Sequence, residues 1–306
     1  MGDAIGVLAA ALNTTLGGLA VGVTRFVVGA TDPITLAALR FGIGAVLLLP
    51  FALGQPERWP QRRDLPAVVG LGLVYFALYP VLFNAALAST TAVRGALALS
   101  TAPLLTMAAA AVLGVEPLTA RKTLGVLVAT AGVAAALTAG LAAAPAGAWR
   151  GDLLMVAAAL CAALYSVWSR PLIGRSGTVP YTVSGMLLGA IVLATVSVAW
   201  GGAGSVAALD RTAWAAIAYL GALGSALAFY LWTFALERTT PTRVAITMTL
   251  NPIAAGLFGV VALDEPVTLE LVAGLLMVLL GIGLAATGAP VAGAAARKPT
   301  GGTGAD

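Results

Sequence analysis

The sequence predicts an all-α integral membrane protein, with ten transmembrane helices arranged as two inverted five-helix repeats around a central cavity. Three observations lead to this fold class. Of the 306 residues, 60% are hydrophobic and only 9% are charged, whereas soluble domains carry about 25% charged residues. Apolar blocks long enough to cross a bilayer recur along almost the whole chain. The second half of the chain also repeats the residue pattern of the first.

Ten apolar segments, each of the length that a membrane-spanning helix requires, are separated by charged or Gly/Pro-rich joints. The predicted spans are 4–28, 32–53, 65–88, 91–114, 119–141, 150–170, 178–200, 212–236, 241–263 and 267–288. The first of them lacks the basic start and the small-residue cleavage site of a signal peptide, so we interpret it as a span. The tail at 289–306 is predicted to be a disordered cytoplasmic segment.

Basic residues are distributed unevenly over the predicted loops. If the N-terminus is cytoplasmic, eleven of the 16 Lys and Arg residues fall in cytoplasmic loops and the tail, and four fall in the opposite loops. The remaining one, Arg40, lies inside the second span. This positive-inside bias predicts a multi-pass protein with both termini in the cytoplasm. The net charge of +4 is then explained by topology and by contact with anionic lipid, and we expect no nucleic-acid partner.

An internal repeat divides the chain into two halves. Residues 86–125 align without a gap on residues 235–274, at an offset of 149. The matched pairs are Thr90-Thr91 with Thr239-Thr240, Arg94 with Arg243, Pro103 with Pro252, Glu116-Pro117 with Glu265-Pro266, and, near the start of each half, Gly2-Asp3 with Gly151-Asp152. We therefore predict a first repeat at 1–145 and a second at 146–288. Because each holds five spans, the second enters the membrane inverted, a construction typical of alternating-access transporters.

Several chemistries are excluded by residues that the chain lacks. It has no histidine and one cysteine, Cys161, which we interpret as a core residue. Imidazole catalysis, histidine or cysteine metal sites and an intrachain disulfide framework are therefore not expected. We expect no cofactor, no metal site and no enzymatic activity, because a membrane enzyme acting on lipid would need paired acids, histidines or a metal. No predicted span carries an acidic residue near its middle, so no proton-carrying carboxylate is evident.

Aromatic residues form stripes along three of the predicted spans. Their spacings of i, i+4 and i+8, or i, i+4 and i+7, place each set on one helix face. The stripes are Tyr75, Tyr79 and Phe83; Cys161, Tyr165 and Trp168; and Ser225, Phe229 and Trp232. They are candidate cavity walls that would stack against a flat apolar substrate. Helix packing is the competing interpretation, and the spacing does not decide between the two.

Polar residues within spans are candidate substrate contacts. Asn13 in the first span and Asn251 in the ninth are deep enough that each must face a cavity or a partner helix. Ser100 and Thr101 precede Pro103 and are able either to line the cavity or to bond carbonyls that the proline frees. Arg40 could bind a substrate carboxylate or could be structural.

Pro103 and Pro252 are predicted to bend their spans near the bilayer midplane and to act as hinges. The alternative is a kink that shapes static packing. Glu116 and Glu265 are expected to close helix ends as turn and cap elements.

The chain resembles the drug/metabolite transporter superfamily and, within it, the ten-span EamA type. The resemblance depends on three features: the Glu-Pro turns near the end of each half, in "LGVEPLTARKTLG" and "ALDEPVTLELVAG"; Arg40 in "ITLAALRFGIGAVLLLP"; and the mid-span prolines in "TAPLL" and "LNPIA". It extends over residues 3–288. It implies that spans one to four and six to nine surround a central cavity and that spans five and ten support them.

The resemblance implies a secondary-type transporter. Members of this superfamily export amino acids, other metabolites or drugs, and distant relatives carry nucleotide sugars or triose phosphates. The chain is most similar to exporters of aromatic amino acids in bacterial inner membranes. We therefore expect export of small amphipathic metabolites, aromatic or hydrophobic amino acids above all, by a monomer in contact with membrane lipid. A nucleotide-sugar, sugar-phosphate or drug transporter of this superfamily is the alternative, and a passive channel is the alternative of another class.

Overall fold

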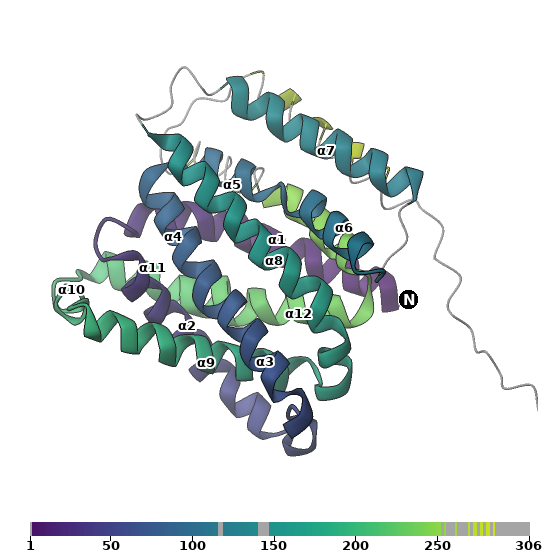
Figure 1. Ribbon diagram of the computed structural model, residues 1–306. Coiled ribbons are helices and arrows are strands. Elements are labelled where there is room, and N and C mark those ends of the chain that lie inside the picture. Colours follow the sequence, from purple (N-terminus) through teal and green to yellow (C-terminus); the bar gives the residue numbers. More distant parts are fainter. Residues whose placement is uncertain are drawn as a thin grey trace, which may run out of the picture.

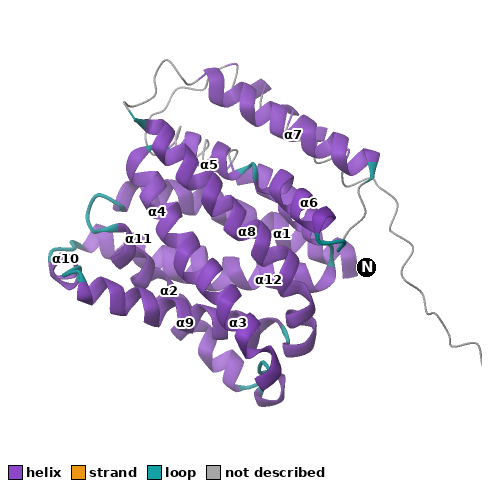
Figure 2. Ribbon diagram, in the orientation of Figure 1, coloured by secondary structure: helices purple, strands orange, loops and turns teal. Residues whose placement is uncertain are grey.

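The computed structural model describes residues 2–115, 119–139 and 147–251, together with positions 254, 261, 269, 272, 273, 276, 277, 280, 281 and 284. Within these residues every regular element is a helix (Figure 2). Seven helical segments there are long and apolar enough to cross a membrane. The predicted all-helical membrane class is therefore confirmed for this part of the chain.

The first half opens with four helical segments before the third span. They are α1 (Gly2–Val27), α2 (Pro33–Leu53) and the 3-10 turns η1 (Pro56–Arg58) and η2 (Arg62–Asp64). The third span is a composite of α3 (Leu65–Gly72), the π-helical turn η3 (Leu73–Leu78) and α4 (Tyr79–Ser89). After it come α5 (Ala92–Leu99), α6 (Ala102–Val112) and α7 (Ala120–Ala139), and α7 lies along one side of the bundle, beside α5 and α6 (Figure 1).

The second half is described continuously as far as Asn251. It comprises α8 (Ala148–Ser176), α9 (Thr178–Ala199), the short α10 (Ala203–Ala207), α11 (Arg211–Gly221), the π-helical turn η5 (Ala222–Leu227), α12 (Ala228–Arg238), α13 (Pro241–Thr247) and the 3-10 turn η6 (Met248–Leu250). Adding 149 to the bounds of η3 and α4 gives the bounds of η5 and α12. The offset of the sequence repeat therefore also relates local backbone structure in the two halves.

Seven of the predicted spans coincide with the seven membrane-spanning candidates to within a few residues. These are the first, second, third, fourth, sixth, seventh and eighth. The fifth corresponds to α7, of which Thr123–Gly132 is a shorter apolar helix. The ninth begins with α13 and η6. The rest of the ninth span, the tenth, the tail, Glu116, Pro252 and Glu265 lie outside the continuously described residues.

Helix starts are set by side chains that accept hydrogen bonds from the first free backbone N–H groups. Asp32 accepts from the N–H groups of Ile34 and Thr35 at the start of α2. The threonines matched by the repeat have equivalent roles: the hydroxyl of Thr91 accepts from the N–H of Arg94 at the start of α5, and that of Thr240 accepts from the N–H of Arg243 at the start of α13.

Close helix packing depends on small residues. α2 lies against α9, where Gly44 faces Met186, and α9 also lies against η3. A Cβ added to Gly189 in α9 would lie 2.6 Å from the carbonyl carbon and the Cβ of Phe76. Helices in a membrane gain little from the hydrophobic effect and approach through small residues instead. Glycine at position 189 therefore permits the contact between α9 and η3.

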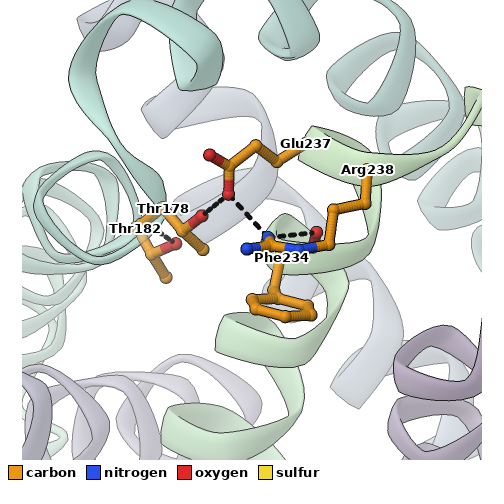
Figure 3. A network of polar contacts seen from close by, with 5 residues as sticks. All are labelled: Thr178, Thr182, Phe234, Glu237 and Arg238. Atoms are coloured by element: carbon orange, nitrogen blue, oxygen red, sulfur yellow. Dashed lines mark hydrogen bonds and ion pairs between the residues drawn. The ribbon is translucent and has the colours of Figure 1, made fainter. Parts of the chain in front are cut away.

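Polar contacts connect the helix ends as well. The hydroxyl of Thr178, at the start of α9, donates to Glu237 Oε2 near the end of α12 at 2.5 Å (Figure 3). The same carboxylate pairs with Arg238 at 2.8 Å, and the Arg238 guanidinium carbon lies 3.5 Å from the centre of the Phe234 ring. This network fixes α9 against α12 at one end of the bundle.

Candidate substrate cavity

The candidate site is a cavity in the interior of the bundle. It is bounded by α1, α2, η3, α4, α5, the η5–α12 segment, and the region from η6 to Asn251. The lining residues are Asn13, Thr14, Gly17, Ala20, Arg40, Tyr75, Tyr79, Phe83, Leu99, Gly224, Ala228, Phe229, Trp232, Met248 and Asn251. Both halves of the chain therefore contribute to one site.

The structure brings together at the cavity seven of the predicted stripe and polar residues, in addition to Arg40. They are Asn13, Tyr75, Tyr79, Phe83, Phe229, Trp232 and Asn251. Tyr165 lies one layer behind, stacked on Tyr75 with ring centres 4.0 Å apart. Trp168 does not reach the cavity, because its side chain is 45% exposed on the outside of the bundle.

Ser100 and Thr101 bond the backbone and do not line the cavity. The Ser100 hydroxyl donates to the carbonyl of Ala96 at 2.9 Å, and the Thr101 hydroxyl donates to that of Ala98 at 2.8 Å. These are the carbonyls of the last turn of α5, where the helix hydrogen-bond ladder stops. Neither acceptor is the carbonyl that Pro103 leaves without a backbone donor, which belongs to Leu99, so these contacts differ from both predicted roles.

Aromatic rings form one wall of the cavity. Phe229 is at its centre, with ring centres 5.1 Å from Phe41, 5.2 Å from Tyr75 and 5.4 Å from Phe76. Tyr79 continues the wall, 5.2 Å from Tyr75. These separations are those of favourable edge-to-face and offset ring pairs. The wall is therefore a continuous aromatic surface contributed by both halves of the chain.

Two π-helical turns meet the cavity and are related by the repeat offset. η3 carries Tyr75, and η5 carries Gly224 and Ser225. A π turn inserts one extra residue into a helix and is frequent at functional sites. Both Tyr75 and the adjacent Phe76 contact Phe229 here. Sequence reasoning did not select Phe41 or Phe76, because neither lies on a predicted stripe.

Arg40 lies at the cavity with 4% of its surface exposed. Its Nε donates to the hydroxyl of Ser225 at 3.0 Å, and its Nη2 donates to the carbonyl of Gly224 at 3.0 Å. Both acceptors belong to the π turn η5 and are uncharged. The guanidinium carbon also lies 5.9 Å from the centre of the Phe83 ring, within the range of a cation–π contact. The structure thus orients a buried cation at the cavity.

Helices at the cavity are interrupted near Pro103 and Asn251. α5 ends at Leu99 and α6 begins at Ala102, so Pro103 lies in the first turn of a new helix. A proline costs little there, because the first helical N–H groups have no partner within the helix. Pro103 therefore does not interrupt the backbone hydrogen bonds of a continuous helix. In the second half, α13 gives way to the 3-10 turn η6 just before Asn251.

The cavity encloses about 50 Å³. Sites for small organic ligands usually measure about 300–1,000 Å³. In this arrangement the cavity is therefore too small for an organic ligand, which can be accommodated only after helices move.

Comparison with known proteins agrees with a transport fold. The model of the EamA-like transporter family matches the chain twice, at residues 4–138 and at residues 149–287. The chain belongs to the EamA-like transporter family. The two matches of this EamA-like protein correspond closely to the halves predicted from the repeat.

Curated relatives of this EamA-like protein are similar over most of its length. An uncharacterized transporter of Archaeoglobus fulgidus is 28% identical over 275 residues, which are 89% of this chain and 95% of the relative. An uncharacterized protein of Pseudomonas aeruginosa is 33% identical, covering 88% of each. A probable terminal-alkyne amino-acid exporter of Streptantibioticus cattleyicolor is 29% identical, covering 79% of this chain and 80% of the relative.

A solved crystal structure has the same fold. It superposes with a TM-score of 0.71 over 93% of this chain and 95% of the other, at 23% sequence identity. The likeness extends to nearly the whole of both chains and concerns the fold.

Proposed function

We propose that this EamA-like transporter exports small amphipathic metabolites, with aromatic or hydrophobic amino acids as its main substrates. The observation that carries the proposal is the composition of the cavity: an aromatic wall, a buried cation and two amide side chains surround one space. An aromatic amino acid combines a flat apolar ring with a carboxylate and an ammonium group, which suits such a lining. The Streptantibioticus cattleyicolor relative, a probable terminal-alkyne amino-acid exporter, points to the same class.

Transport by alternating access follows from the proposed architecture. Ten spans in two inverted repeats would allow the halves to exchange roles and open the cavity to each side in turn. The paired π turns, the two family-model matches and the small volume of the cavity support this arrangement. We place the protein as a monomer in a bacterial inner membrane, with both termini in the cytoplasm.

The proposal is tested by efflux from bacterial cells that overproduce the protein. Cells fed phenylalanine-containing dipeptides accumulate phenylalanine, and we expect the overproducing strain to release it faster and to resist p-fluorophenylalanine. Release indistinguishable from that of cells with an empty vector, at verified membrane levels of the protein, would exclude amino-acid export. Faster release of sugar phosphates or drugs instead would favour the alternative substrates.

The hinge role proposed for Pro103 gives a separate prediction. Pro103→Ala restores a backbone N–H and permits one continuous helix from α5 to α6. We expect slower substrate exchange with unchanged protein levels, because a continuous helix bends less readily. The measurement is the exchange rate in proteoliposomes, and an unaltered rate would make the break an element of static packing.

A further inference from the structure

We propose that Arg40 is the carboxylate-binding residue of the cavity, so that the ligand is a zwitterionic α-amino acid. The proposal rests on the proposed function and identifies the subsite. Arg40 is buried at the cavity, and its two hydrogen-bond acceptors, Ser225 and Gly224, are neutral. Among the described residues no carboxylate lies within ion-pair distance of Arg40. An unpaired charge inside a membrane protein is costly and is usually retained for function.

The contacts of Arg40 leave part of its guanidinium free for a ligand. Nε and Nη2 are held by the π turn η5, whereas Nη1 donates no hydrogen bond to any residue in the described part of the chain. Arginine binds carboxylates through pairs of N–H groups in a fixed planar arrangement. The π turn therefore orients the guanidinium, and a carboxylate entering the cavity would supply both the missing acceptor and the missing negative charge.

Other cavity atoms match the remaining groups of an amino acid. The side-chain oxygen Oδ1 of Asn251 is buried and accepts no hydrogen bond, so it can accept one from a ligand ammonium group. The rings of Tyr75 and Tyr79 offer a surface for an aromatic or apolar side chain. The described lining holds one cation, which balances a carboxylate but leaves a phosphate dianion partly uncompensated.

The test compares ligands that differ only in the carboxylate. In proteoliposomes with wild-type protein, we expect phenylalaninamide and phenethylamine to compete with labelled phenylalanine at least about tenfold more weakly than phenylalanine does, as the loss of a charged hydrogen bond implies. Arg40→Gln should abolish this preference, and Arg40→Lys should restore part of it. Arg175→Gln is the matched control: Arg175 pairs with Asp64 and does not line the cavity, so its loss should retain the preference.

Two results would overturn the assignment. One is equal competition by phenylalaninamide and phenylalanine in the wild type. The other is an undiminished preference for the carboxylate in Arg40→Gln. A wild-type protein that moves no amino acid contradicts the proposed function itself, so the two failures are distinguishable. If Arg40→Gln does not fold, Arg40→Lys is compared with the wild type instead. An Arg40→Lys protein that retains both the tenfold preference for phenylalanine over phenylalaninamide and the wild-type affinity for phenylalanine would contradict the need for the guanidinium.

A different observation concerns the two ends of the bundle. We infer that two matched polar clusters, here called clasps, are the gates that close the cavity toward opposite membrane faces. In the first clasp, Asp152 at the start of α8 pairs with Arg94 at 2.5 Å and accepts from the hydroxyl of Thr90 at 3.0 Å. Arg94 and Thr90 belong to the start of the fourth span.

The second clasp has the same chemistry with the halves exchanged. Asp3 at the start of α1 pairs with Arg243 and accepts from the hydroxyl of Thr239 at 2.5 Å. Adding 149 to Asp3, Thr90 and Arg94 gives the positions of Asp152, Thr239 and Arg243. Each clasp therefore joins one half of the chain to the other through the same three residue types.

The clasps lie at opposite ends of the bundle. Asp3 is at the start of α1, whereas Arg25 near the end of α1 donates to the carbonyl of Leu87, next to Thr90 of the other clasp. The 22 residue steps from Asp3 to Arg25 extend over roughly 33 Å of helix, about the thickness of a membrane. Both clasps are formed in the structure, in agreement with the small volume of the cavity.

The two clasps differ in how well they are satisfied. In the first, Nε and Nη1 of Arg94 are buried without a hydrogen-bond partner, so opening would let water reach them. In the second, the Asp3 side chain is 52% exposed, against 21% for Asp152. Exposed ion pairs are weak because water screens them. Opening would therefore hydrate unpaired nitrogens in the first clasp, and in the second it would break an ion pair that is already partly exposed.

The test measures access to the cavity from each membrane face. Ala228→Cys is introduced as a cavity reporter in a Cys161→Ala background and labelled with a membrane-impermeant thiol reagent in right-side-out and inside-out vesicles. We expect Asp152→Asn to raise labelling several-fold from the face that carries the first clasp, and Asp3→Asn to raise it from the other. Exchanging the charges, with Arg94→Asp and Asp152→Arg together, should reduce labelling again.

A matched control is Asp64→Asn. It breaks the ion pair of Asp64 with Arg175 at 2.8 Å, which has no counterpart under the offset of 149, and it should leave the ratio of labelling between the two faces unchanged. Labelling raised from the same face by both Asp152→Asn and Asp3→Asn, or raised by neither, would overturn the assignment. An equal shift in Asp64→Asn would also contradict it.

Discussion

Gly189→Ala is expected to destabilise the protein by about 1–3 kcal/mol, the usual cost of overpacking a close contact. The added Cβ would meet the backbone of Phe76 in η3 at 2.6 Å, and backbone atoms cannot move aside as a side chain can. α9 would have to shift away from η3, which carries Tyr75 of the aromatic wall. The measurement is the melting temperature in detergent, together with the fraction of monodisperse protein.

Gly70→Ala is the matched control for this prediction. A Cβ at Gly70, in α3 next to η3, meets nothing within 4 Å, and alanine favours a helix over glycine by about 1 kcal/mol. We expect Gly70→Ala to melt at the wild-type temperature or slightly above it. A Gly189→Ala protein that is as stable as Gly70→Ala would show that the approach of α9 to η3 is looser than described.

Tyr79→Ala is expected to lower amino-acid transport roughly tenfold or more. The ring lines the cavity and lies 5.2 Å from Tyr75 and 5.7 Å from Phe83. Its removal deletes a surface on which the substrate ring would stack. Full burial of a large apolar side chain contributes about 1.5–3 kcal/mol. Tyr79→Phe retains the ring and should retain most of the transport. The measurement is initial uptake in proteoliposomes at equal protein content.

The control for Tyr79→Ala is Trp168→Ala. Both changes remove an aromatic ring, but Trp168 is exposed on the outside of the bundle, so its loss should leave transport near the wild-type rate. If Tyr79→Ala transports normally while correctly folded, the third-span stripe has a packing role. If Trp168→Ala is impaired equally, removal of any large ring is sufficient, and the cavity assignment loses its support.

Much of the fold could be predicted because hydrophobic length is a strong signal in a membrane protein. The first span was placed at 4–28 and the helix runs from Gly2 to Val27. All three residues of the third-span stripe line the cavity, because α4 retains regular helical spacing after Tyr79. The repeat offset of 149 relates the bounds of η3 to those of η5. It does not indicate that either segment forms a π turn.

Local structure explains why the sequence reasoning missed one residue of the site and misplaced another. Phe76 contacts the aromatic wall because the π turn η3 changes the helical spacing. No residue pattern in the sequence predicts such a turn. Trp168 shares a helix face with the buried Tyr165, but the neighbouring helices do not cover it at its level. The sequence repeat pairs Asp152, Thr90 and Arg94 with their counterparts in the other half of the chain. It does not predict that these three residues contact one another, because that contact depends on which helix ends lie together in the fold.

The most direct test of the central claim is counterflow in proteoliposomes. Vesicles loaded with unlabelled phenylalanine and diluted into labelled phenylalanine should show a transient, saturable accumulation of label that empty vesicles lack. Tryptophan, threonine and methionine extend the panel, and conductance across a planar bilayer should be absent. Failure of all four amino acids to exceed the empty-vesicle background, or a non-saturable conductance, would contradict the account of this protein as an alternating-access amino-acid exporter.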